Sequence, residues 1–356
     1  MKKRAGEIRM KILKRIFTDG LSGMTTGWFC TFVAGTILQQ IGSWIGGSAG
    51  GLLQTSGLVL KVFAGAAIGA GVSYKLGESA VITSAAAAAG MIGAYSTQII
   101  DGSVIIDGMV RLNGPGQPLT AFVAAYVGIE IGRLVMGKVK SIRILAPFLT
   151  IIAGGGAGLI VSPYIEIFIG KIGDIIRWGT TQSPLVMGAV VAAVMGIACT
   201  LPINPIAFGA MLNLSGIAAG AAAAGCSAQM IGFAAAGLRE NGIGGFLAQG
   251  IGTSMLQLPN IIRKPWIWIP SILSGAVLGT VSAAVLKMTN DAQGAVMGTS
   301  GLSGVISAYH AMGADAGAAV FVFVMYVAAP AVLTYFTAEA MRRAGVIKTG
   351  DMRLDI

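Results

Sequence analysis

Apolar segments recur along nearly the whole chain, and short polar or glycine-rich segments separate them. A helix that crosses a membrane needs about 20 consecutive, mainly apolar residues. The pattern therefore predicts an all-α polytopic membrane protein with about eight full transmembrane helices plus short or re-entrant helix pairs. The full spans are expected at residues 22–42, 57–73, 80–99, 119–136, 144–169, 184–200, 266–286 and 316–337.

Three apolar stretches are too short or too interrupted to read as simple spans. Pro202, Pro205 and Gly216 break the pattern after residue 200, so residues 207–238 are predicted to form two short helices. Residues 242–258 and 294–312 are apolar and rich in glycine, which favours re-entrant or interfacial hairpins.

Composition narrows the class of membrane protein. The chain is 55% hydrophobic and 11% charged, and 54 of its 356 residues are glycine. Glycine lets apolar helices approach closely and break at membrane depth. Substrate sites of transporters are commonly built from interrupted helices of this kind, so a transporter-like domain is expected.

The net charge of +10 comes from basic residues beside the apolar spans, which indicates membrane orientation rather than nucleic-acid binding. Residues 1–20 are expected to form a basic amphipathic segment on the membrane lipid, because Ile8, Ile12 and Ile16 share one helix face. Residues 21–340 form the transmembrane domain and 341–356 a cytoplasmic tail. Both termini and residues 138–143 are expected inside, and residues 101–117 outside. Residues 171–177 then fall in an external loop despite carrying two basic residues.

No cofactor or metal site is expected. Cys30, Cys199 and Cys226 lack a C-x-x-C spacing, and His310 is the single histidine. The sequence contains no Walker motif, dinucleotide fingerprint or catalytic triad, which argues against ATP-driven transport by this chain alone.

Neutral polar residues concentrate where the backbone is least regular. Proline and glycine free backbone groups there, and amide and hydroxyl side chains add donors and acceptors with little net charge. This lining suits a small polyhydroxylated solute, although such residues can also simply join helices. The candidate substrate-binding residues are Asn204, Gln229, Asn241, Gln249, Thr253, Ser254, Gln257, Asn260, Thr299 and Ser300.

Four runs in this region resemble one family. They are Glu240-Asn-Gly-Ile-Gly-Gly, Gln249-Gly-Ile-Gly-Thr-Ser-Met-Leu-Gln-Leu-Pro-Asn260, Trp266-Ile-Trp-Ile-Pro270 and Met297-Gly-Thr-Ser-Gly-Leu302. Together they resemble the membrane (IIC) component of bacterial phosphotransferase-system sugar transporters, in the compact branch that includes perfringolysin-regulator-like membrane proteins. The resemblance implies a homodimeric permease of the bacterial cytoplasmic membrane that works with separate cytoplasmic IIA and IIB proteins. It also implies that Glu240 is the catalytic polar anchor of the sugar.

Two further residues are possible secondary site members. Glu130 is an intramembrane carboxylate, and such groups are often functional, but Arg133 at i+3 can neutralise it. His310 follows a re-entrant candidate, where a lone histidine is more often structural than functional.

The leading function is therefore uptake of a small sugar or polyol-like solute. A sugar phosphotransferase activity would require partner IIA and IIB chains. The alternatives are a membrane-bound regulator or sensor that retains a solute site without phosphotransfer, and a secondary transporter of an organic anion. The last should place a basic group near the site, and Arg239 is the nearest candidate.

Overall fold

The computed structural model describes residues 13–138 and 144–355. Their backbone divides into two compact units with the boundary between Ile167 and Phe168. Helices dominate both units, and the expected all-α polytopic membrane fold is confirmed. Most of the N-terminal amphipathic segment and of the 138–143 loop lies outside the described residues, so those two predictions remain predictions.

The first unit is a set of helices with one small hairpin. Its strands β1 (Ile105–Ile106) and β2 (Met109–Val110) pair antiparallel across a turn in which Asp107 and Gly108 both have positive φ angles. Its helices are η1 (Arg15–Gly20), α2 (Leu21–Trp28), η2 (Phe29–Val33), α3 (Ala34–Ile45), α4 (Gly47–Val62), α5 (Ala64–Lys75), α6 (Ala80–Ala94), α7 (Ser96–Ile100), α8 (Pro118–Lys138) and the first part of α9 (Ala146–Thr180).

Glycine allows the helices of this unit to pack with their backbones nearly touching. A Cβ atom at Gly27 on α2 would lie 2.3 Å from the Ala67 carbonyl oxygen on α5. No side chain fits at that distance, so the contact requires glycine. Close packing of this kind is typical of helices in lipid, where small residues bring helix backbones together.

The second unit contains the remaining helices. They are the end of α9, α10 (Pro184–Thr200), α11 (Pro205–Leu212), α12 (Gly216–Ala236), α13 (Leu238–Leu247), η4 (Ala248–Gly252), η5 (Ser254–Gln257), α14 (Leu258–Arg263), η6 (Pro265–Trp268), α15 (Ile269–Thr280), η7 (Val281–Val285), α16 (Ala292–Met297), η8 (Ser300–Leu302), α17 (Ser303–Ala311), α18 (Ala316–Phe323), η9 (Val324–Ala328) and α19 (Ala329–Arg343).

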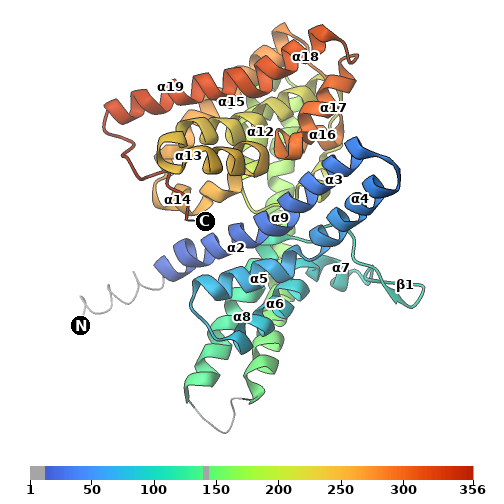
Figure 1. Ribbon diagram of the computed structural model, residues 1–356, viewed down its shortest axis with the longest axis vertical. Coiled ribbons are helices and arrows are strands. Elements are labelled where there is room, and N and C mark those ends of the chain that lie inside the picture. Colours follow the sequence, from blue (N-terminus) through green and yellow to red (C-terminus); the bar gives the residue numbers. More distant parts are fainter. Residues whose placement is uncertain (1–12, 139–143, 356) are drawn as a thin grey trace. The chain divides into compact units, whose positions relative to one another are not determined.

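Helix α12 is the centre of the second unit. Its residues from Ala219 to Ala236 are all buried, and it packs against α10, α15 and α19. Figure 1 shows α19 and α15 running beside α12 within this unit. Because most side chains of α12 are alanine or glycine, the surrounding helices approach it closely.

Six helices of the described residues are long and apolar enough to cross a membrane, and a seventh span results if the pair α4 and α5, bent by 55°, counts as one. Helices α6 and α10 occupy two of the expected spans but are shorter than the others. The predicted breaks at residues 242–258 and 294–312 are present as short helices, with positive φ angles at Gly242, Gly298 and Leu302.

Two local predictions need correction. Residues 207–238 form two helices as predicted, the short α11 and then α12, but α12 is not short, because it is long enough to span a membrane. Its glycines pack against neighbours instead of ending the helix: a Cβ at Gly225 would lie 2.0 Å from the Ala192 carbonyl oxygen. Residues 171–177 are helical within α9 rather than a loop, and Asp174 pairs there with Arg177 (2.9 Å) and Lys171 (3.8 Å).

Candidate functional site

A break in α13 places Glu240 and Asn241 at the edge of the second unit. The break is at Gly242, whose φ of 63° and ψ of −166° form a backbone conformation open essentially to glycine alone. Leu238, Arg239 and Ile243 around it are exposed, whereas the Glu240 side chain is only 5% exposed. A carboxylate buried within an exposed segment requires partners, since an unpaired buried charge is costly.

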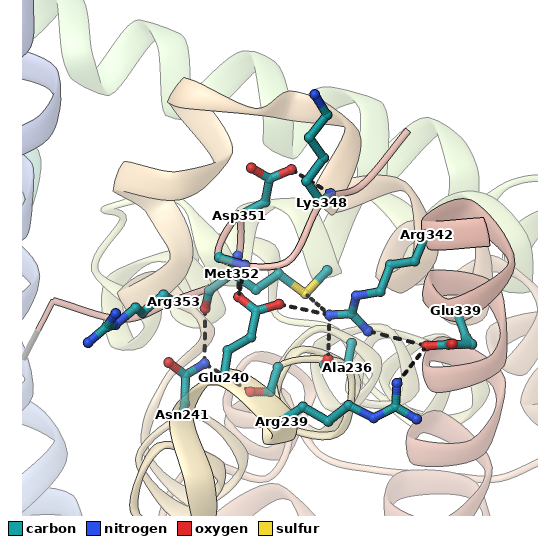
Figure 2. Close-up of polar contacts among 12 residues, drawn as sticks. Ala236, Arg239, Glu240, Asn241, Glu339, Arg342, Lys348, Asp351, Met352 and Arg353 are labelled. Carbon is teal, nitrogen blue, oxygen red and sulfur yellow. Dashed lines mark hydrogen bonds and ion pairs between the residues drawn. The ribbon is translucent and has the colours of Figure 1, made fainter. Parts of the chain in front are cut away.

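The partners of Glu240 come from the far end of the chain. Oxygen Oε1 accepts a 3.1 Å hydrogen bond from Arg342 at the end of α19, and Oε2 accepts the backbone N–H groups of Gly350 and Met352, each at 3.0 Å. Figure 2 shows the carboxylate enclosed between the Arg342 guanidinium and the backbone around Met352. One cation and two amide donors thus supply the hydrogen-bond partners that this buried carboxylate needs.

Four amide side chains lie beside Glu240, and three of them hydrogen-bond to the backbone of residues 352–354. Asn241 donates to the Met352 carbonyl (2.9 Å) and accepts from the Leu354 N–H (2.8 Å). Gln257 donates to the same Met352 carbonyl (2.9 Å) and to Gln249 Oε1 (2.8 Å).

Asn260 completes the set by donating to the Arg353 carbonyl (2.8 Å) and to Gln257 Oε1 (2.9 Å). Five sequence-predicted site residues are therefore brought together, and we call them the Glu240 cluster: Glu240, Asn241, Gln249, Gln257 and Asn260.

Arg342 is a member of the site that the sequence did not single out. Besides Glu240 it binds the Ala236 carbonyl at 2.9 Å, and its Nη1 lies 3.9 Å from Glu339. Glu339 also pairs with Arg239 at 3.2 Å. Arg342 lies in the predicted cytoplasmic tail, and no local sequence pattern connects it with a carboxylate 102 residues away.

Gln229 and Ser254 belong to a second buried polar group. Ser254 lies 2.9 Å from the Thr200 hydroxyl, and the Trp268 indole N–H donates to Gln229 at 3.0 Å. The Thr200 hydroxyl also reaches Gln229 at 3.5 Å. These side chains join α10, α12, η5 and η6, so their polar groups are used in packing these elements together.

The remaining predicted residues support the broken backbone. Thr299 donates to the Gly250 carbonyl (2.5 Å) and Ser300 to the Gly252 carbonyl (2.9 Å), which ties the two broken segments together. Thr253 accepts from the Met255 N–H and caps η5, and Asn204 accepts from the Ile206 N–H and caps α11. The side chains of these four residues therefore hold local backbone segments of the second unit in place.

Neither secondary candidate joins this cluster. Glu130 lies in the first unit, where it binds Arg133 (2.6 Å) and Arg15 (2.7 Å), and Arg15 also binds Glu78 (2.6 Å). His310 is exposed in the last turn of α17, with its ring 5.5 Å from that of Tyr309.

Lys61 in the first unit was not among the predicted site residues. Its side chain is 7% exposed, donates to Gln39 and lies over the Phe32 ring, 5.3 Å from its centroid. The signal was available, because a lysine inside the apolar segment 57–73 is an unusual intramembrane charge.

Within residues 13–138 and 144–355, no group of three or more His, Cys, Asp or Glu side chains could hold a metal ion. The Glu240 cluster instead offers one carboxylate and several amides, which recognise hydroxyl, amide or carbonyl groups through hydrogen bonds.

The chain also matches a known protein family. Residues 18–354 match the family described as "Phosphotransferase system, EIIC", while no curated protein matches the chain significantly. The match covers nearly the whole chain, including every residue of the Glu240 cluster. The chain therefore belongs to the EIIC family of the phosphotransferase system and is a multi-pass membrane component of sugar transport.

Proposed function

We propose that this protein is the permease for a small sugar or polyol-like solute and that the Glu240 cluster binds the solute. The observation that carries the proposal is the present use of the cluster: its side chains accept hydrogen bonds from backbone N–H groups and donate hydrogen bonds to backbone C=O groups. Each hydroxyl of a sugar can donate and accept. Neighbouring hydroxyls can therefore satisfy the same side chains.

In this proposal Glu240 binds and polarises one sugar hydroxyl. Arg342, hydrogen-bonded to Oε1, fixes the orientation of the carboxylate. Phosphorylation would then proceed at a hydroxyl held there. The hydroxyl oxygen forms a bond to the phosphorus of the phosphorylated IIB protein, the bond between phosphorus and IIB breaks, and Glu240 accepts the hydroxyl proton.

The proposal includes a location and an assembly. We place the protein in the bacterial cytoplasmic membrane, with both termini and residues 138–143 on the cytoplasmic side and residues 101–117 outside. This puts the Glu240 cluster, which contacts the C-terminal residues, at the cytoplasmic side where IIB acts. We further propose a homodimer, and light scattering in nanodiscs tests it; a monomer at all protein concentrations would contradict it.

A regulator or sensor is the second candidate, and one observation favours it. The residues of the Glu240 cluster are already occupied by the chain's own backbone. A protein whose site is filled in this way could report solute without transporting it. An organic-anion carrier has less support, since both nearby arginines pair with carboxylates, Arg342 with Glu240 and Arg239 with Glu339.

Solute binding to the full-length protein in nanodiscs tests the proposal. A panel of radiolabelled hexoses and hexitols is measured by equilibrium dialysis against wild type, Glu240→Gln and Asn241→Ala. Losing one buried hydrogen-bonding partner should weaken binding roughly 5- to 150-fold, most strongly for Glu240→Gln.

Glu339→Gln is the matched control, because Glu339 pairs with Arg239 and Arg342 in the same charge network but is not a member of the Glu240 cluster. Equal affinity of all four proteins would reject the Glu240 cluster as the solute site. Binding of a sugar without uptake into proteoliposomes that contain phosphorylated IIB would favour the regulator.

A further inference from the structure

The last residues of the second unit fold back onto the Glu240 cluster. After α19 ends at Arg343, the chain turns at Gly345 (φ 74°) and again at Gly350 (φ 96°). We call residues 348–355 the C-terminal segment. Met352 anchors it, since its side chain is fully buried and packs with Phe233 and Ile267 among others.

The Glu240 cluster recognises this segment through its main chain. Six hydrogen bonds join cluster side chains to backbone atoms of Gly350, Met352, Arg353 and Leu354. In contrast, the side chains of Lys348, Thr349 and Arg353 are exposed, and Figure 2 shows Lys348 pointing away from the carboxylate. Hydrogen bonds to the main chain are one way in which proteins bind extended peptides.

We propose that the Glu240 cluster is a peptide-binding site and that the C-terminal segment is its resident, exchangeable ligand. The segment holds no helix or strand, and Met352 is its one buried side chain. Segments without regular secondary structure and with few buried apolar contacts open locally at low cost compared with core helices. The cluster is therefore alternately covered and free.

One consequence rests on the proposed function. If a sugar binds the same carboxylate and amides, the C-terminal segment and the sugar exclude one another. The apparent affinity for sugar is then the affinity of the open form multiplied by the fraction of molecules with an open segment. An open fraction of about one tenth would weaken sugar binding about tenfold, and opening the segment would restore it.

A free peptide with the sequence of residues 346–355 tests the site directly. The peptide carries a fluorophore, and its binding to full-length protein in nanodiscs is measured by fluorescence anisotropy. Two full-length variants open the resident segment without changing the cluster. Gly350→Pro removes the N–H group that donates a hydrogen bond to Glu240, and proline cannot adopt the positive φ angle of this position. Met352→Ala removes the buried side chain that anchors the segment.

The free peptide should bind both opened variants at least about tenfold more tightly than wild type, because the tethered segment competes in wild type. Thr349→Ala is the control, since this exposed residue should leave the segment in place. Adding Glu240→Gln to the Gly350→Pro variant should weaken peptide binding about tenfold or more.

Each alternative outcome is informative. Failure of the peptide to bind either opened variant, both eluting as homogeneous folded protein, would overturn the proposal. Equal peptide affinity for wild type and the opened variants would also overturn it. So would a peptide affinity that Glu240→Gln leaves unchanged. If the peptide binds as expected but no hexose or hexitol displaces it, the peptide site stands and the proposed solute function of the cluster fails.

Discussion

Glu240 and Arg342 are separated by 102 residues in the sequence and joined by a 3.1 Å hydrogen bond in the fold. Both side chains are largely buried, at 5% and 13% exposure. The pair fixes the start of α13 to the end of α19, and α19 in turn leads the C-terminal segment to the cluster. A charge interaction therefore positions the segment that covers the candidate site.

Removing the cation should destabilise the second unit. Arg342→Gln leaves the Glu240 carboxylate buried without its ionic partner, which typically costs about 3–5 kcal/mol. Thermal unfolding in detergent should show the loss as a lower Tm. Arg343→Gln is the control at the neighbouring, exposed position. The double variant Arg342→Gln with Glu240→Gln should recover part of the loss, and a purely additive double variant would contradict the pairing.

Gly242→Ala should destabilise the break in α13 through backbone strain alone. The φ of 63° and ψ of −166° suit only glycine, while a Cβ there meets no atom of the described residues within 4 Å. The expected cost is about 1–3 kcal/mol in the free energy of unfolding. Gly244→Ala is the matched control, because its Cβ also meets no described atom within 4 Å and its φ is not positive. Equal Tm values for the two variants would refute the strain argument.

Gly27→Ala should weaken the packing of α2 on α5. Its Cβ would lie 2.3 Å from the Ala67 carbonyl oxygen, so the helices must separate, at a cost of typically about 1–3 kcal/mol. Gly51→Ala on α4 is the comparison, since the added Cβ meets none of the described atoms within 4 Å. A Tm difference between the two variants, measured in the same detergent, checks the prediction. Should Gly27→Ala unfold no earlier than Gly51→Ala, the close contact is not needed.

The sequence predicted the broken backbone of the site because its signals are local. Proline, glycine and clustered amides mark residues 238–260 and 294–312, and the helices there are short and interrupted. For residues 207–238 the same local reasoning predicted two helices correctly but underestimated the length of α12. The glycines of α12 allow close contact with helices that are distant in the sequence, for example with Ala192 on α10. Whether a glycine packs against another helix or ends its own helix is visible only in the folded unit.

The membership of the cluster was predictable only in part. Glu240, Asn241, Gln249, Gln257 and Asn260 lie within about 20 residues of one another, so irregular backbone alone suggested their proximity. Arg342 and the backbone of Met352 arrive from more than 90 residues away. Recognition of a main chain leaves no side-chain pattern in the recognised segment, so the sequence could not have indicated the C-terminal segment as a ligand.

Asn260→Asp should release the C-terminal segment without changing the size of the side chain. The Asn260 amide donates to the Arg353 carbonyl and to Gln257 Oε1, and a carboxylate oxygen there would face two acceptors instead. Loss of a donated bond and the new repulsion should raise the open fraction about tenfold or more. A spin label on Thr349→Cys, with Cys30 replaced by serine, reports this as a more mobile spectrum. Asn213→Asp is the control, because Asn213 is exposed at the end of α11, where aspartate tolerates the left-handed backbone. An immobile label in both variants would mean that Asn260 does not hold the segment.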